Sequence, residues 1–156
     1  MKIFPENHIH VIVHPKENPR KCTVPLIRNH FPRAHYYYDI SEDLEFPVGT
    51  FLLYPDDDAQ DIESCKDQIK HICLLDGTWN QAKQLKRLEG VNQLPTIILN
   101  NAETQYLRGK NCPNKKLLAT SEALHFFLLK MGWKNTPLLE TMIDAFNNRK
   151  GTTNLI

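Results

Sequence analysis

The chain has 156 residues, 41% hydrophobic and 24% charged, with a formal net charge of +1. This size and apolar content suit one domain, residues 1–156, that buries its own core. There is no run of about 18 uncharged apolar residues, so no transmembrane helix is expected, and the N-terminus lacks the features of a signal peptide. The four cysteines are scattered without a C-x-x-C pair, which argues against a zinc site and against a disulfide framework. A reduced, cytoplasmic setting is therefore expected.

Charge is distributed unevenly along the sequence. Residues 39–67 hold ten acidic side chains and a single basic one, Lys66, which leaves eight acidic and eighteen basic residues elsewhere. A polyanion could meet a basic face while the acidic segment points away from it. Ordinary solvated surface charge explains the same pattern equally well.

Short apolar runs alternate with segments of helical period. Strands are predicted at residues 9–13, 50–54, 71–75 and 94–99, with a brief strand or an aromatic patch at residues 36–38. Helices are predicted at residues 24–31, weakly at 61–69, from Trp79 to a stop at Gly90, from a cap at Thr120 to a stop at Gly132, and at 137–149. Residues 150–156 are expected to fray. The alternation predicts an α/β fold, a parallel-rich sheet with helices on both faces.

One junction between a strand and a helix carries a carboxylate. The apolar run that ends at Leu75 is followed by Asp76 and Gly77, and a helical period begins at Trp79. Asp-Gly also suits a hairpin, but the helical period argues against a second strand here. Asp76 therefore lies at the carboxyl end of a strand, where open α/β sheets bind ligands. Asp76 or Thr78 can cap the helix, so capping explains Asp76 about as well as a functional role does.

Two further strand ends carry marked loops, Tyr54–Pro55 and Leu99–Asn100. If the strands are parallel, these loops and the Asp76 turn lie along one edge and can line one pocket. The helix start at residues 120–122 could close this pocket with free backbone N–H groups. The polar loop at residues 100–116 is long for a compact domain, which favours a functional role.

Other candidate chemistries are weak. The sequence has no G-x-G-x-x-G motif, no Walker lysine loop and no nucleophile elbow. The three adjacent acids at residues 56–58 lack the spacing of metal ligands, and no metal is expected. Cys73 lies inside an apolar strand and is expected in the core. His125 is expected to be a satisfied or a surface histidine.

The sequence resembles the DTW-domain family. Asp76-Gly77-Thr78-Trp79, followed by Ala82, is similar to the family's D-x-T-W signature. Further pieces stand in the family's order over roughly residues 11–124: His14-Pro15-Lys16-Glu17, Leu53-Tyr54-Pro55 with Ala59, Tyr106-Leu107-Arg108 and Thr120-Ser121-Glu122-Ala123. Two features depart from the family: this sequence starts after the N-terminal cysteine module of many relatives, and residues 21–25 replace a T-N-T-G-like run.

The resemblance implies a SPOUT-like fold with a C-terminal trefoil knot, although general topology rules make any knot improbable. It also implies an enzyme that uses S-adenosylmethionine as co-substrate and moves its 3-amino-3-carboxypropyl group to N3 of a tRNA uridine. The products would be acp3U and methylthioadenosine. The alternatives are a SPOUT-like RNA methyltransferase and a non-catalytic RNA- or nucleoside-binding protein. The identity of the uridine stays open, and a monomer is weakly favoured.

The resemblance also assigns roles to single residues. Asp76 is the catalytic candidate, either as general base or as a group that orients the nucleobase. The candidates for binding S-adenosylmethionine are Tyr54, Pro55, Gly77, Thr78, Trp79, Leu99, Leu118, Thr120, Ser121 and Glu122. The candidates for binding RNA are His14, Lys16, Arg108, Lys115 and Lys116. The last three could contact either phosphate or the substrate's carboxylate.

Overall fold

The computed structural model describes residues 4–16, 24–38, 44–99 and 120–132. Within them, six strands form one sheet in the order β2-β1-β5-β3-β6-β4, and every neighbouring pair is parallel. The α/β fold with a parallel sheet is therefore confirmed. The long loop at 100–116, the helix at 137–149 and the predicted knot lie outside the described residues.

Within the described residues, the predicted strands and helices agree closely with the structure, and one short strand, β4, was not predicted. The strands are β1 (Ile9–Val13), β2 (His35–Tyr37), β3 (Thr50–Leu53), β4 (Gln60–Asp61), β5 (His71–Asp76) and β6 (Thr96–Ile98). The α-helices are α1 (Val24–His30), α2 (Ile62–Cys65), α3 (Trp79–Lys86), α4 (Glu89–Asn92) and α5 (Thr120–Lys130). Two 3-10 turns, η1 (Glu6–His8) and η2 (Lys66–Gln68), precede β1 and β5. No helix in these ranges is long and apolar enough to cross a membrane.

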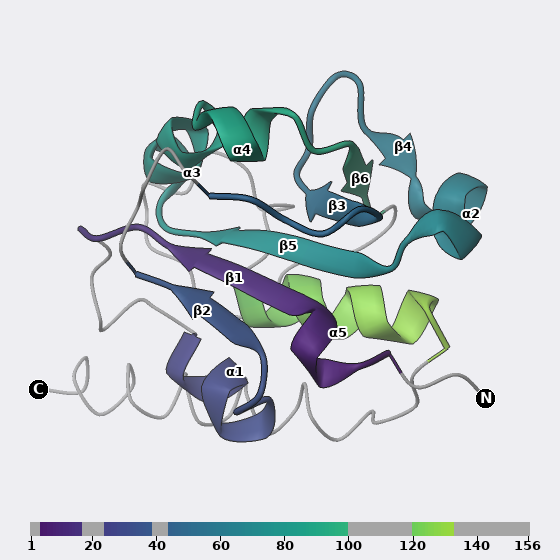
Figure 1. The fold of residues 1–156 in the computed structure, drawn as a ribbon, viewed down its shortest axis with the longest axis horizontal. Coiled ribbons are helices and arrows are strands. Elements are labelled where there is room, and N and C mark those ends of the chain that lie inside the picture. The colour runs from purple at the N-terminus through teal and green to yellow at the C-terminus, as the bar shows by residue number, and fades with distance from the viewer. Residues whose placement is uncertain (1–3, 17–23, 39–43, 100–119, 133–156) are drawn as a thin grey trace, which may run out of the picture.

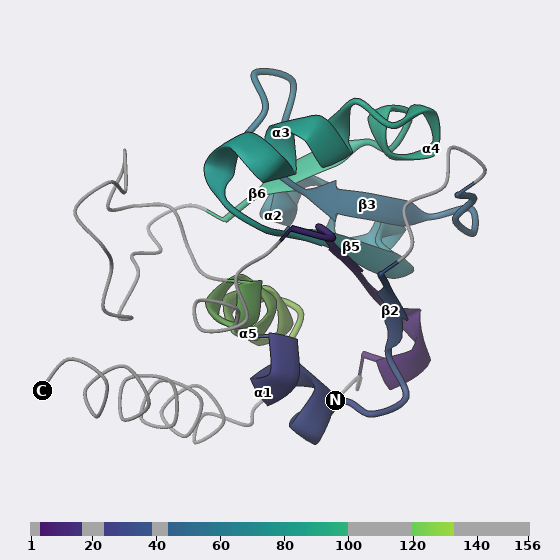
Figure 2. The same ribbon diagram turned by 90° about the vertical axis from the view of Figure 1, so that its left-hand side faces the viewer.

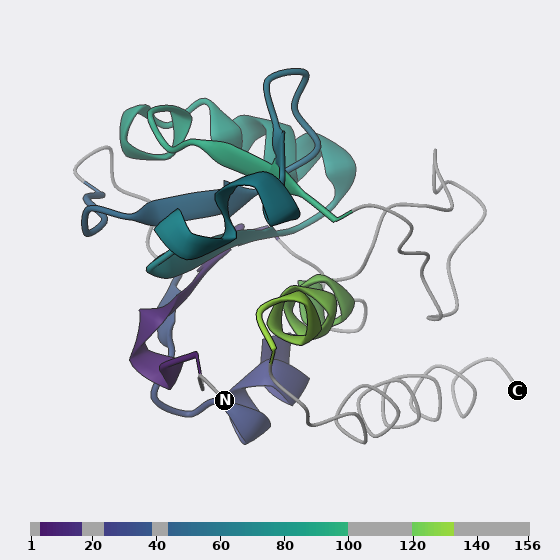
Figure 3. The same ribbon diagram turned by 90° about the vertical axis from the view of Figure 1, so that its right-hand side faces the viewer.

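The sheet is covered on both faces, as the sequence predicts. Helices α1 and α5 lie on one face and α3 and α4 on the other, which Figures 2 and 3 show from opposite sides. Strand β5 supplies both layers because its side chains alternate between the two faces. Ile72 and Leu74 join the core cluster beneath α5, whereas Cys73 and Leu75 pack with Leu85 of α3.

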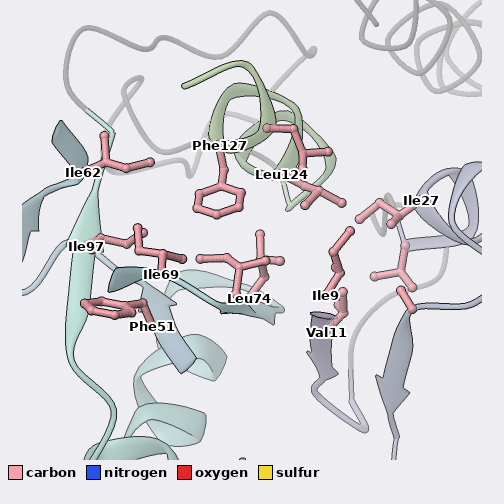
Figure 4. Close-up of a cluster of buried hydrophobic side chains, with 14 of the residues drawn as sticks. Ile9, Val11, Ile27, Phe51, Ile62, Ile69, Leu74, Ile97, Leu124 and Phe127 are labelled. Atoms are coloured by element: carbon pink, nitrogen blue, oxygen red, sulfur yellow. The ribbon is translucent and has the colours of Figure 1, made fainter. Parts of the chain in front are cut away.

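The larger core cluster fixes the position of α5. Leu124 and Phe127 of this helix share a core cluster with Leu74 and Phe51 of the sheet (Figure 4), and all four side chains are buried. Fully burying one such side chain contributes about 1.5–3 kcal/mol. The N-terminus of α5 is thereby held near the carboxyl end of β5.

Two predicted helix boundaries are wrong in detail. Gly90 does not stop the helix that begins at Trp79, since α3 ends at Lys86 and Gly90 lies within α4. The reason for a glycine there is close packing, because a Cβ at this position would lie 2.0 Å from the carbonyl oxygen of Leu44. Thr120 was predicted as the cap of α5 but is itself a helical residue.

Candidate functional site

The carboxyl ends of the parallel strands meet at one edge of the sheet. Val13 is in register with Asp76, and β3 and β6 flank each other on the other side of β5. The loops that begin at Tyr54, Gly77 and Leu99 therefore all leave the same edge. The predicted alignment of the three marked loops is confirmed, and we call this the carboxyl edge.

Asp76 is a buried carboxylate at this edge, with only 4% of its surface exposed. Its side chain lies on the same face of β5 as Leu74, toward α5. The hydroxyl of Thr120 donates a hydrogen bond to Oδ1 of Asp76 at 2.5 Å. The backbone N–H of His14 donates to the carbonyl of Asp76 at 2.9 Å. Thr120 thus fixes the carboxylate, and His14 fixes the backbone of the same residue.

Helix α3 is capped by Thr78, which answers the question that the sequence left open. The N–H of Gln81 donates to Oγ1 of Thr78 at 3.2 Å, and the N–H of Thr78 donates to Oε1 of Gln81 at 2.9 Å. This is a reciprocal capping box. Capping therefore no longer explains why a carboxylate stands at position 76.

Gly77 is needed at the turn because of close approach. A Cβ at this position would lie 2.9 Å from Cβ of Gln81 and 3.3 Å from Cβ of His14. Real side chains do not tolerate the first of these distances. The glycine lets the turn pass between α3 and the loop after β1.

The loop after β1 is fastened to α3 by two glutamines. The backbone N–H of Lys16 donates to Nδ1 of His14 at 3.1 Å, so that nitrogen carries no proton, and Nε2 donates to Oε1 of Gln84 at 2.9 Å. Nε2 of Gln81 donates to the carbonyl of Lys16 at 3.3 Å. His14 is buried and Lys16 is exposed. Of these two predicted RNA contacts, Lys16 offers its side chain to solvent, and His14 holds the loop in place.

Tyr54 and Trp79 form a stacked pair, with ring centroids 5.8 Å apart and an interplanar angle of 14°. Both rings are half-buried, and Tyr54 packs against the core cluster beneath α3. Burial raises the pKa of the Tyr54 hydroxyl, Asp56 raises it further, and Arg87 opposes the shift. The pair therefore lies at the same edge as Asp76 but on the other face of the sheet.

The start of α5 contributes a second buried carboxylate. Ser121 and Glu122 are fully buried in its first turn. The partial positive charge of a helix N-terminus stabilises a carboxylate there. Asp76 is hydrogen-bonded to Thr120, and Glu122 follows Thr120 by two residues in the same turn of α5.

The remaining predicted site residues are less closely tied to this arrangement. Pro55 is exposed, and Leu99 packs partly buried against the larger core cluster. Four predicted residues lie outside the described ranges: Leu118, Arg108, Lys115 and Lys116.

The structure also places the residues that the sequence assigned to the core. Cys73 is fully buried, and burial raises the pKa of its thiol, as suits a core residue and not a nucleophile. His125 is buried, and burial lowers its pKa. Within the described ranges, no group of three or more histidine, cysteine or acidic side chains is placed to hold a metal ion.

Sequence reasoning missed the roles of Gln81 and Gln84. Gln81 had a signal, since T-x-x-Q at residues 78–81 is the capping-box pattern. Gln84 had none, because its partner His14 is 70 positions away and only the fold brings them together.

A comparison with family models matches the DTW domain over residues 2–150. The chain belongs to the DTW-domain family. No curated protein and no solved structure matches the chain.

DTW domains are associated with tRNA-modifying enzymes, which makes RNA the substrate class expected at this site. The D-x-T-W residues of this DTW protein divide into three structural tasks. Asp76 presents a buried carboxylate, Thr78 caps α3, and Trp79 stacks on Tyr54. The site is therefore a carboxylate on one face of the sheet edge and an aromatic pair on the other.

Proposed function

We propose that this DTW protein is a tRNA-uridine aminocarboxypropyltransferase that acts at the carboxyl edge. The observation that carries the proposal is the buried carboxylate of Asp76, fixed by Thr120 and not needed as a helix cap. Membership in a family associated with tRNA modification supports the same substrate class.

When bound, S-adenosylmethionine would supply a 3-amino-3-carboxypropyl group activated by its sulfonium, with methylthioadenosine leaving as the new N–C bond forms and the C–S bond breaks. The buried carboxylate of Asp76 suits a cation of this kind, because a carboxylate stabilises a nearby positive charge. The polar groups proposed to orient S-adenosylmethionine are Thr78, Thr120 and the first turn of α5. Gly77 keeps the turn next to Thr78 free of a side chain.

Asp76 is proposed to take the N3 proton of the uridine. Uridine N3–H is a weak acid and must lose its proton as the nitrogen becomes bonded to carbon. A carboxylate held at a fixed position can accept that proton or hold the nucleobase in line. Thr120 acts through Asp76, because its hydrogen bond fixes the rotamer of the carboxylate.

Product analysis tests the reaction type directly. The protein is incubated with S-adenosylmethionine and bulk tRNA, and the nucleosides are then analysed by mass. We expect acp-uridine together with methylthioadenosine. Methylated nucleoside with S-adenosylhomocysteine would instead show methyl transfer, and cofactor binding without any product would show a binding protein.

Substitution of the carboxylate tests its assignment. Asp76→Ala should abolish or strongly reduce acp-uridine formation. The matched control is Asp67→Ala, which removes an exposed carboxylate from η2. Wild-type rates in Asp76→Ala would contradict the catalytic assignment even if the product were confirmed.

A further inference from the structure

The outer side of α3 carries a stripe of three cations beside a tryptophan, and the proposed chemistry does not use the cations. Trp79, Lys83 and Lys86 recur at spacings of four and three residues, and the capping residue Arg87 follows them. Such spacings place side chains on one side of a helix. The buried residues of this helix, Ala82 and Leu85, face the sheet instead. We call residues 79, 83, 86 and 87 the α3 stripe.

Two ammonium groups of the stripe are held against the stacked aromatic pair. Nζ of Lys83 lies 5.2 Å from the ring centroid of Trp79. Nζ of Lys86 lies 5.9 Å from the ring centroid of Tyr54. Cation–π contacts of this length position a lysine head that would otherwise move freely. The stripe is therefore a partly ordered cationic surface beside an aromatic platform.

The charges of the stripe are only partly balanced. Lys86 lies 3.8 Å from a carboxylate oxygen of Asp56 and donates a hydrogen bond to Asn92 at 3.0 Å. Among the residues that the structure describes, neither Lys83 nor Arg87 has an ion pair, and both side chains are exposed. The positive charge available to a ligand is thus concentrated on Lys83 and Arg87, one helical turn apart.

We propose that the α3 stripe binds the sugar–phosphate backbone of the RNA substrate beside the target uridine. This inference rests on the proposed function and adds the surface that recognises the polymer. Lys83 and Arg87 would neutralise phosphates, and the partly exposed rings of Trp79 and Tyr54 would contact an adjacent nucleotide. Such contacts position a nucleic acid without reading its sequence.

An extended polyanion fits this arrangement better than a small anion does. The stripe lies over the α3 face of the sheet, whereas Asp76 points toward α5 on the other face of the same edge. A strand that crosses the edge can touch both, and its phosphates recur at every nucleotide. A single carboxylate, such as that of S-adenosylmethionine, would use only one of the two exposed cations.

The test compares tRNA binding by the wild type, Lys83→Gln/Arg87→Gln and the control Lys130→Gln. Lys130 is an exposed lysine at the last residue of α5, at the opposite end of that helix from Thr120. Fluorescence anisotropy is measured over a range of salt concentrations, with S-adenosylmethionine affinity measured separately. We expect the double variant to bind tRNA roughly tenfold more weakly and its salt slope to fall by about 1–2, since each lost phosphate contact lowers the slope by about 1. The control should match the wild type.

The outcomes separate this inference from the transferase proposal. Wild-type affinity and salt slope in the double variant would overturn the stripe as an RNA surface. Weakened binding of S-adenosylmethionine with unchanged tRNA binding would also overturn it and would assign the cations to that carboxylate. If the stripe variants lose tRNA affinity but the wild type makes no acp-uridine, the RNA surface stands and the transferase proposal fails.

Discussion

The two edges of the sheet are built from the same strands but hold their titratable groups in opposite ways. At the carboxyl edge, β1 and β5 end in the His14 loop and in Asp76, and hydrogen bonds from α3 and α5 fix both. At the amino edge, the same two strands supply His10 and His71, and β2 adds His35. One edge presents a fixed carboxylate, and the other packs imidazoles against one another.

The amino ends of the strands carry four histidines, residues 8, 10, 35 and 71, that we call the histidine cluster. His8 stacks on His71 with ring centroids 3.9 Å apart, and His10 stacks on His35 at 4.9 Å. The ring nitrogens of His10 lie 2.9 Å from Oη of Tyr37 and 3.0 Å from Nδ1 of His71. Burial lowers the pKa of His10 to about 4, and His35, His71 and His8 add to the shift.

The comparison shows that the two ends of the same parallel strands have different roles: residues at the amino ends contribute to packing, and residues at the carboxyl ends form the candidate site. The histidine cluster is held by ring stacking and by the hydrogen bonds of His10, and burial lowers the pKa of His10 and of His71, so its contribution is to packing. The carboxyl edge is held by directed hydrogen bonds to loops, which fix an acidic group where ligands approach. Substitutions at the carboxyl edge should therefore reduce activity, whereas substitutions in the histidine cluster should change how stability depends on pH.

The largest expected effect is on activity, from Asp76→Asn. Asparagine keeps the size of the side chain and an acceptor for Thr120, but it cannot take the N3 proton. If Asp76 is the base, the rate of acp-uridine formation should fall roughly 10²- to 10⁴-fold. Single-turnover kinetics measure the rate, and thermal unfolding checks that the fold is retained.

A smaller loss of rate in Asp76→Asn than in Asp76→Ala would show that Asp76 orients the nucleobase, since the amide can still make a hydrogen bond. Asp67→Asn, an exposed carboxylate in η2, should leave the rate unchanged.

The next effect is steric, from Gly77→Ala at the turn after Asp76. Its Cβ would lie 2.9 Å from Cβ of Gln81, so α3 or the His14 loop must shift. Overpacking of this kind costs about 1–3 kcal/mol of unfolding free energy. Denaturant unfolding measures it. Gly132→Ala is the control, because Gly132 has a positive φ of 96° but no neighbour within 4 Å, and it should cost about 1 kcal/mol from the backbone conformation alone.

Equal losses in the two glycine variants would show that α3 and the His14 loop shift at no extra cost when a Cβ is added at position 77. The hydrogen bonds of Gln81 and Gln84 to that loop would then hold it less rigidly than expected.

The fold was more predictable from the sequence than the site. Period-2 and period-3.6 patterns located β1, β3, β5, α3 and α5 because burial imposes those periods on local sequence. The predicted helix end at Gly90 was wrong because this glycine is required by close packing against the carbonyl of Leu44. No local sequence pattern encodes that contact.

At the site, sequence alone aligned the strand ends but could not assign faces. Tyr54 and Trp79 were expected to share one pocket with Asp76, and the structure places the aromatic pair on the other face of the edge. The histidine cluster was not predicted, since it joins residues from three separate segments.

The third prediction concerns the histidine cluster and its pH dependence. The folded pKa of His10, about 4, lies below the ordinary value of 6.5, so the folded state binds fewer protons than the unfolded state between these values. Stability is therefore fully present above pH 6.5 and falls as the pH drops toward 4. The loss should be roughly 2 kcal/mol, less than the full shift because solvent and neighbours screen the ring.

His10→Phe should flatten this dependence while keeping a ring in the stack. Unfolding free energies are measured by denaturant at several pH values from 7 to 4. The slopes of free energy against pH are compared, because Phe also removes two hydrogen bonds and so lowers stability at every pH. His30→Phe, on the exposed end of α1, should keep the wild-type slope. An unchanged slope in His10→Phe would show that another group, and not His10, causes the loss of stability at low pH.

The smallest expected effect comes from Thr78→Ala, which removes the cap of α3 at the carboxyl edge. The loss of the Oγ1 acceptor leaves the N–H of Gln81 without its capping partner and should cost about 1 kcal/mol. Asp61→Ala is the comparison, since Asp61 caps the single turn of α2 through a longer contact of 3.4 Å and should cost less. If the carboxyl edge is held by directed hydrogen bonds, Thr78→Ala should also reduce acp-uridine formation, because Gln81 links the cap to the His14 loop. A stability loss with an unchanged rate would instead show that Asp76 and Thr120 keep their geometry independently of α3.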